Sequence, residues 1–312
     1  MAGIAVAVEE KSFNKDFTKV TRDIEASQKI YRESMTYMQG VIRTLRRNKV
    51  AVVSFFFIIF LILVAIFGPM LFPDYQKQDL LNTLQPPSKE HILGTDEQGR
   101  DVLTRLIRGT RISLTIGFVA ETINLIIGII YGGIAGFIGG KTDNIMMRII
   151  DVLMSIPQTL VMILMLTVLK RGMGTLILSL TVTGWIGLAR LVRGQILALR
   201  ENEYVTASRV LGASRKEILA THLIPNAIGP IIVNYTMSIP GAIGAEAGMS
   251  YLGLGISVPE ASWGNMLQFG ASQFPASLWL FFAPAVLFAL SMLAFNLFGD
   301  GLRDALDPKM RK

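Results

Sequence analysis

The sequence predicts an all-α fold that crosses a membrane with about six transmembrane helices. Of its 312 residues, 51% are hydrophobic and 17% are charged, whereas soluble globular domains contain about a quarter charged residues. The hydrophobic residues also fall into long runs, and about 20 such residues are enough to cross a bilayer as a helix. These two observations indicate that lipid surrounds much of the chain.

The first hydrophobic run, Val50–Phe72, predicts the first membrane helix. Residues 1–49 precede it and contain many charges of both signs, so the run is not a secretory signal peptide. A basic cluster stands directly before it: Arg43, Arg46, Arg47 and Lys49. Because such cations stay on the cytoplasmic side of a membrane helix, residues 1–49 are predicted to be a cytoplasmic segment.

Five further runs predict the remaining spans: Ile112–Ile138, Ile145–Leu169, Leu176–Val192, Ala227–Ala247 and Leu278–Phe298. The third of these is the weakest, because Arg190 and Arg193 lie at its end. An even number of spans puts both termini on one side, which we predict to be the cytoplasm because about 22 of the 30 Lys and Arg residues then lie there. Residues 50–111 are predicted to hold the first span and an external segment, and residues 112–312 the core transmembrane domain.

Glycine recurs at every fourth position of the second span, at Gly128, Gly132, Gly136 and Gly140. This spacing places the four residues on one helical face, where small side chains let two helices approach closely. We expect this face to pack against another helix of the same chain. An interface with a second subunit is the alternative.

Composition excludes several classes of active or binding site. The chain has no cysteine and only two histidines, His91 and His222, so it offers no thiolate or His-rich metal site. The stretch Gly139–Thr142 lacks the earlier glycine of a phosphate-binding loop, and no nucleophile elbow or His-Glu-x-x-His pair occurs. We therefore expect no enzymatic activity and no bound cofactor or metal, and we attribute the net charge of +7 to membrane topology rather than to nucleic-acid binding.

Three acidic residues fall within the predicted spans: Glu121, Asp151 and Glu246. A charge is costly in hydrocarbon, so each is expected to face the interior of the helix bundle or a wet cavity. A structural polar contact is the expected role. A relay along a translocation pathway is the alternative.

Residues 200–226 predict a helix–break–helix elbow on the cytoplasmic side. The segment begins with good helix formers, and Gly212 then ends the first helix in the left-handed conformation. Ser214 and Glu217 form a capping box for a second helix, which Pro225 closes just before the next span. Such an elbow is suited to transmit a movement from a partner, and an amphipathic connector on the lipid surface is the alternative.

The elbow resembles the Glu-Ala-Ala loop of permease subunits in ATP-driven, binding-protein-dependent importers. That pattern has an acidic residue, then small residues, then a glycine nine residues after the acid. Val205 occupies the position of the family's second small residue, and this variant is typical of peptide importers. The resemblance implies that the elbow docks into a cleft on an ATPase subunit. It assigns this coupling to Glu203, Tyr204, Ala207, Ser208, Leu211, Gly212 and Ala213.

Three more stretches narrow the resemblance to the peptide/nickel class of these importers, and to the second, C-type, of its two permease subunits. They are residues 91–114, beginning His-Ile-Leu-Gly-Thr-Asp, residues 251–267, beginning Tyr-Leu-Gly-Leu-Gly, and residues 295–308, ending Asp-Pro. The similarity covers roughly residues 40–312, with the four matches in the family's order.

The resemblance implies a type I ABC importer permease fold in the cell membrane of a prokaryote. This chain and a homologous permease would enclose the pathway, two ABC ATPases would bind ATP and Mg²⁺, and an external substrate-binding protein would deliver the cargo. Peptides are the expected cargo, and nickel chelates or other small solutes are the alternatives. A self-sufficient channel or secondary transporter would need an inverted repeat or a ring of charged pore residues, and we find neither. A membrane-anchored scaffold would leave the four motifs without a role.

A charged cluster lies in the predicted external segment, at Asp96, Arg100 and Asp101. Local ion pairs would fix this loop, whereas the resemblance implies that the external binding protein docks here. Both roles are compatible with the sequence. Trp263 and Trp279 are expected to anchor the chain at the membrane interface.

Overall fold

The computed structural model describes residues 36–307. Most of the predicted cytoplasmic segment, residues 1–35, and the last motif residue, Pro308, lie outside this range. The described residues form an all-α fold, as predicted, whose only β pairing is an isolated bridge between Thr95 and Asp101. The elements are α2 (Tyr37–Arg47), α3 (Lys49–Leu71), α4 (Val102–Ile138), α5 (Gly140–Met154), α6 (Gln158–Val168), α7 (Met173–Leu199), α8 (Glu203–Val210), α9 (Arg215–Glu217), the π-helix η1 (Ile218–Leu223), α10 (Ile224–Tyr251), α11 (Trp263–Ser272) and α12 (Leu278–Leu306).

Five helical segments are long and apolar enough to cross a membrane, and the bent pair α5–α6 would make a sixth span. The prediction of one helix over Ile145–Leu169 is wrong, because α5 and α6 meet at an angle of 71°. The break falls at Ser155–Pro157. Pro157 disfavours a helical conformation at the residue before it and has no N–H to continue the ladder, which explains the bend.

Three helices extend beyond their predicted spans, and in α4 and α7 polar side chains near the end have partners. Asp101 caps α4 by accepting a hydrogen bond from the backbone N–H of Thr104 at 2.8 Å, so α4 begins at Val102 and the boundary between residues 111 and 112 falls inside it. α7 continues past Arg190 and Arg193 because both are paired with carboxylates on α5. α12 likewise continues to Leu306.

The second helix of the elbow does not end at Pro225. The chain is helical from Arg215 to Tyr251, through α9, η1 and α10. In η1 the hydrogen bonds shift by one residue, and the N–H of Ile224 donates to the carbonyl of Leu219. Pro225 lies directly after this shift, as the second residue of α10.

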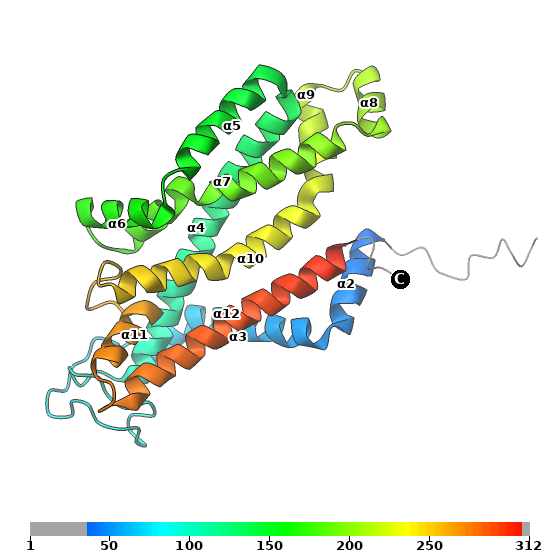
Figure 1. The fold of residues 1–312 in the computed structure, drawn as a ribbon. Helices are drawn as coiled ribbons and strands as arrows, with labels where there is room; N and C mark the ends of the chain where they lie inside the picture. Colours follow the sequence, from blue (N-terminus) through cyan, green and yellow to red (C-terminus); the bar gives the residue numbers. More distant parts are fainter. Residues whose placement is uncertain (1–35, 308–312) are drawn as a thin grey trace, which may run out of the picture.

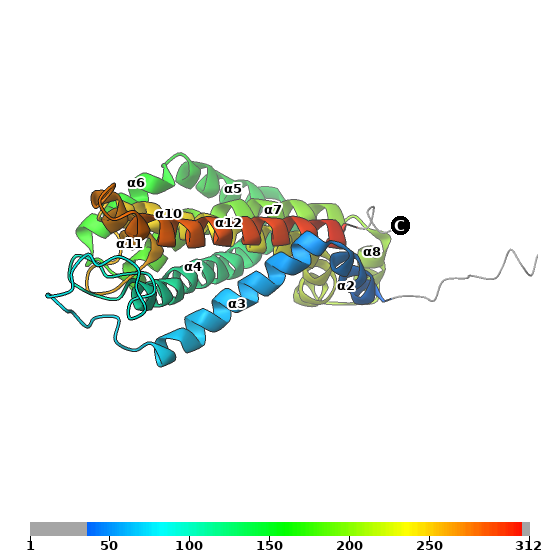
Figure 2. The ribbon, with the colours of Figure 1, turned by 90° about the horizontal axis from the view of Figure 1, so that it is seen from below.

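The helices run between two ends of the molecule. Figure 2 shows α2, α8 and the end of α12 at one end, and α11 with the loop over residues 72–101 at the other. We call these the elbow end and the loop end. The first described helix, α2, and the C-terminal end of α12 therefore lie at the same end, as an even number of crossings requires.

The glycine face of α4 packs against α7 of the same chain, as expected. A Cβ added at Gly132 would overlap the carbonyl oxygen of Ala189, and one at Gly136 would lie 2.8 Å from the carbonyl oxygen of Arg193. Gly140 does not belong to this face, because it begins α5 and a Cβ there would meet nothing within 4 Å.

A groove of about 860 Å³ opens near the elbow end, between α7, α10 and α12. In Figure 1 α10 lies between α7 and α12. The groove walls include Leu191 of α7, Pro230 and Met237 of α10, and Arg303 of α12. The groove therefore separates α7 from α12 on one side of α10.

Candidate functional site

The first elbow helix, α8, ends in a left-handed turn as the sequence predicts. Gly212 has φ +88°, a conformation that L side chains rarely adopt. Its N–H donates to the carbonyl of Arg209, and the N–H of Ala213 donates to the carbonyl of Ser208, both at 3.1 Å. These are the two bonds of a Schellman motif, which fixes the direction in which the chain leaves the helix.

The second half of the elbow begins with the predicted capping box. The backbone N–H of Glu217 donates to the Ser214 hydroxyl at 3.2 Å, and the N–H of Ser214 donates to the Glu217 carboxylate at 3.3 Å. Two caps in succession therefore define the bend between α8 and α9.

The tip of the elbow presents hydrophobic side chains to its surroundings while its base is packed. Val210 is 82% exposed and Leu211 is 86% exposed, on the outer side of the turn. Val205, on the opposite side of α8, is buried against Ile196 of α7 and Ile218 of η1. An anchored helix with an exposed hydrophobic tip is a surface suited to docking.

The other predicted coupling residues lie along the same short helix. Glu203, Tyr204 and Ala207 are exposed, and Ser208 and Ala213 are half-buried. The Ser208 hydroxyl donates to the carbonyl of Tyr204 at 2.9 Å. The structure therefore brings all seven residues together at the elbow end.

Glu246 lies in the interior, as expected for an acid within a span. Its side chain is fully buried in α10, and its two oxygens accept hydrogen bonds from Ser113 of α4 at 3.0 Å and from Ser250 at 2.7 Å. The Ser113 hydroxyl also accepts the backbone N–H of Trp263, at the start of α11, at 3.1 Å. The carboxylate is thus the centre of a polar network that joins three helices.

Trp263 is not an interfacial anchor. Its side chain is fully buried, and its indole N–H donates to the Thr110 hydroxyl at 3.1 Å. Trp263 begins α11, a short helix that none of the hydrophobic runs predicts, and the prediction of an interfacial anchor is therefore wrong. The capping box of α11 uses Ser262 with Asn265, a weaker signal than the usual Glu or Gln.

The other two acids within spans have different surroundings. Glu121 is half-buried and accepts a hydrogen bond from Ser238 of α10 at 2.6 Å and one from Asn124 at 3.2 Å. Asp151 lies on the surface of the chain, 49% exposed, and is paired with Arg190 of α7. Glu121 therefore lies at a contact between α4 and α10, whereas Asp151 is not enclosed by this chain.

The charged cluster of the loop end fixes the loop through local contacts. Arg100 is 1% exposed, and its Nε donates to Asp96 at 2.7 Å. The Asp96 carboxylate also accepts the backbone N–H groups of Gln98 and Arg100. Asp101 caps α4 and contacts Nδ1 of His91 at 2.9 Å. The contacts favour the role of a loop staple over that of a docking surface.

A second charged group at the loop end was missed from the sequence. Arg108 of α4 donates to both oxygens of Glu260, at 3.0 Å and 3.2 Å, and lies over the ring of Tyr75. The Tyr75 hydroxyl donates to Glu260 at 2.9 Å. Since these residues are far apart in the chain, no local pattern could have joined them.

This contact changes the acidity of two groups in the loops. Burial alone would raise the pKa of Glu260, but hydrogen bonds from Arg108 and Tyr75, with nearby positive charge, lower it below its ordinary value of 4.5. The pKa of the Tyr75 phenol is raised from 10.0 by burial and by its hydrogen bond to Glu260. Glu260 is therefore held in its charged form.

Comparisons with known proteins agree with these features. Residues 126–312 match the family described as "Binding-protein-dependent transport system inner membrane component". Residues 36–87 match the family described as "N-terminal TM domain of oligopeptide transport permease C". Each match covers a part of the chain that the sequence assigned to membrane spans or their flanks.

Two curated relatives are similar over almost their whole length. The chain is 47% identical over 287 residues to the oligopeptide transport system permease protein OppC of Bacillus subtilis (strain 168), covering 92% of this chain and 94% of that protein. It is 49% identical over 286 residues to the dipeptide transport system permease protein DppC of the same organism, covering 91% of this chain and 89% of that protein.

The fold is similar to that of a solved transporter. An inward-facing structure of the MetNI methionine ABC transporter gives a TM-score of 0.54 at 21% identity, covering 66% of this chain and 97% of that chain. This likeness confirms the fold that the resemblance implied.

Proposed function

Since the chain belongs to the family of binding-protein-dependent transport system inner membrane components, we propose that it forms, with a homologous second permease subunit, the pathway of an ATP-driven peptide importer. The relatives named as oligopeptide and dipeptide permeases support peptides as the cargo. The chain is a multi-pass membrane protein, and we place it in the cell membrane of a prokaryote.

The geometry of the elbow is the observation that carries the proposal. Each of the two permeases offers one elbow to one ABC ATPase subunit, and the exposed Val210 and Leu211 enter a cleft on that subunit. The left-handed turn at Gly212 sets the angle at which they enter. ATP and Mg²⁺ bind to the ATPases, so this chain itself binds no cofactor and catalyses no reaction.

The orientation follows from this assignment. The elbow end faces the cytoplasm with both termini, and the loop end faces outward, where a substrate-binding protein delivers the cargo. The basic residues of α2, including Arg46 and Arg47 in its last turn, agree with this orientation because cations favour the cytoplasmic side.

The helix from Arg215 to Tyr251 connects the elbow to the buried network around Glu246. Closure of the ATPases on ATP binding moves the elbows, and this movement biases the bundle between inward-open and outward-open states. In this mechanism Glu121 and Asp151 line or border the pathway, and Glu246 holds α4, α10 and α11 together.

The first experiment is to purify the tagged chain from native membranes in mild detergent and to identify its partners by mass spectrometry. Recovery of a second permease and of ATPase subunits, with ATP-dependent peptide uptake after reconstitution, supports the proposal. Recovery of the chain alone, active in liposomes without ATP, would support a self-sufficient channel or secondary transporter instead.

A further inference from the structure

A pocket of about 470 Å³ lies toward the loop end, between α4, the α6–α7 connection and the α10–α11 connection. Three arginines line it: Arg108, Arg111 and Arg171. Its apolar walls include Ile112, Met173 and Ile256. We call it the arginine pocket. Its volume lies within the range of about 300–1,000 Å³ that is usual for small-ligand sites.

The charge of the arginine pocket is not balanced by carboxylates among the residues that the structure describes. Glu260 is its acidic wall residue, and both oxygens of this carboxylate are already bound by Arg108, with a further bond from Tyr75. Across residues 36–307, neither Arg111 nor Arg171 has a carboxylate within 4.0 Å. Two positive charges therefore line the cavity without a carboxylate partner among these residues.

The two uncompensated arginines differ in how they are held. Arg171 is tethered across the pocket, because its Nη1 donates to the carbonyl of Gly253 at 2.8 Å. Arg111 lies on α4, one turn before Thr115, and both residues line the pocket. One guanidinium is thus positioned in advance, and the other is free to close on a ligand.

This combination of groups selects a ligand by its chemistry. Guanidinium groups bind carboxylates through paired N–H donors, and a concave site with apolar walls strengthens that attraction. The hydrophobic walls beside the cations suit the side chain of the residue that carries the carboxylate. A bare inorganic anion would leave these walls without contacts.

We propose that the arginine pocket binds the C-terminal carboxylate of a peptide cargo as it enters the pathway, with Arg111 and Arg171 as the binding residues. This inference rests on the proposed function, which supplies both the peptide cargo and the outward orientation of the loop end. The permease would then recognise the C-terminus of a peptide independently of the peptide's sequence.

Because the chain contains no cysteine, binding can be measured by protection of a single introduced thiol. Ser257→Cys places an exposed thiol on the pocket wall, and Thr115→Cys provides a second position if that thiol reacts too slowly. The assembled complex, in lipid nanodiscs without the binding protein, is labelled with a charged methanethiosulfonate reagent. Labelling of this chain is followed by mass spectrometry with increasing trialanine or trialanine amide.

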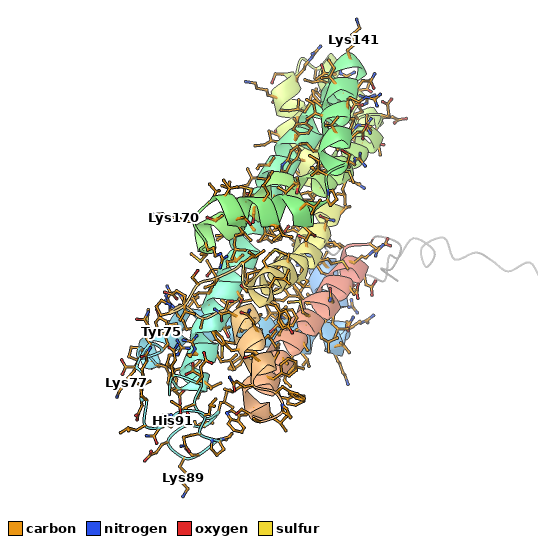
Figure 3. The ribbon with its side chains drawn as sticks, turned by 60° about the vertical axis from the view of Figure 1, so that its left-hand side comes forward. Tyr75, Lys77, Lys89, His91, Lys141 and Lys170 are labelled. Carbon is orange, nitrogen blue, oxygen red and sulfur yellow. The ribbon has the colours of Figure 1, made fainter. Side chains whose placement is uncertain are left out.

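Trialanine is expected to slow labelling at concentrations about tenfold or more below those needed for its amide, because hydrogen bonds to a charged group are the strong ones. Arg111→Gln and Arg171→Gln, each in the Ser257→Cys background, are expected to remove this difference. Lys170→Gln is the matched control, since Lys170 precedes Arg171 but points outward in Figure 3 and does not line the pocket. It is expected to leave the difference unchanged.

Equal protection by the acid and the amide, or a preference that survives in both arginine variants, would overturn the inference. ATP-driven uptake of trialanine by the same unmodified complex, supplied with its binding protein, separates the two hypotheses. Uptake without carboxylate-selective protection refutes the pocket and leaves the proposed function standing. Selective protection without uptake of any peptide refutes the function and retains the site.

Discussion

The guanidinium of Arg193 on α7 donates two hydrogen bonds to the carboxylate of Asp143 on α5, one of them from Nη2 at 2.6 Å. Asp143 is 7% exposed, so this pair is the main polar link between the two helices at the elbow end. Arg190, one turn earlier on α7, makes a similar contact with Asp151, but the Asp151 side chain is 49% exposed against 9% for that of Asp143.

Arg193→Gln is expected to lower the free energy of unfolding by about 1–3 kcal/mol, because it leaves the mostly buried carboxylate of Asp143 without its hydrogen-bond donors. The measurement is chemical unfolding of the purified chain in mixed micelles. Arg190→Gln is the matched control and is expected to change the free energy by less than about 1 kcal/mol, because its pair is exposed. Equal losses in the two variants would contradict the different burial of the pairs.

Gly132→Ala is expected to destabilise the chain by about 1–3 kcal/mol, because the new Cβ would overlap the carbonyl oxygen of Ala189 and force α4 from α7. Gly187→Ala on α7 is the control, since its Cβ would meet nothing within 4 Å. Thermal unfolding in detergent should separate the two variants. An unchanged midpoint for Gly132→Ala would show that the helices can move apart freely.

Gly212→Val is expected to leave the subunit folded but to uncouple transport. The site has room for a side chain, but a β-branched residue resists the left-handed turn by about 1–2 kcal/mol. The elbow tip would then point elsewhere, and substrate-stimulated ATPase activity of the assembled complex should fall severalfold. Gly212→Asn, which tolerates this conformation, should retain most of the activity. Normal stimulation in Gly212→Val would refute the assignment of the elbow.

Glu246→Gln is expected to retain both stability and transport, because the Ser113 and Ser250 hydroxyls can reorient to satisfy an amide. Glu246→Leu should cost about 1–3 kcal/mol for each hydroxyl that loses its acceptor. Thermal unfolding and peptide uptake are measured together. A Gln variant that folds but does not transport would instead identify Glu246 as a proton or substrate relay.

Glu260 is expected to make the loop end sensitive to acid. Because its folded-state pKa is lowered, its contribution to stability is complete above its ordinary pKa of 4.5 and is lost as the pH falls through the lower folded-state pKa. Glu260→Gln should therefore unfold at a lower temperature than the parent chain at neutral pH. The gap between their unfolding midpoints should narrow in acid, and a gap independent of pH would contradict the assignment.

The sequence predicted the features that depend on local chemistry. The left-handed turn at Gly212, the capping box of Ser214 and the first span over Val50–Phe72 all follow from short-range preferences. The interior placement of Glu246 could be predicted because a charge in lipid must find a polar partner.

The features that the sequence did not predict depend on contacts between distant segments. The extension of α7 past Arg193 requires Asp143 on another helix, and the link between Arg108 and Glu260 joins residues far apart in the chain. Pro157 itself indicates a break in the helix, but the hydrophobic run continues on both sides of it and predicts one uninterrupted span. The continuity of the helix past Pro225 depends on a shift of hydrogen bonds that composition does not reveal.

The groove between α7, α10 and α12 gives the subunit an uneven compressibility. At the loop end the interior is filled by large side chains such as Trp263 and Phe295, and close-packed protein resists a change of volume. At the elbow end a groove of about 860 Å³ separates α7 from α12, so these two helices can approach each other there without displacing packed atoms. In the proposed mechanism, a movement of the elbow would therefore change the width of this groove before it changed the packing of the loop end.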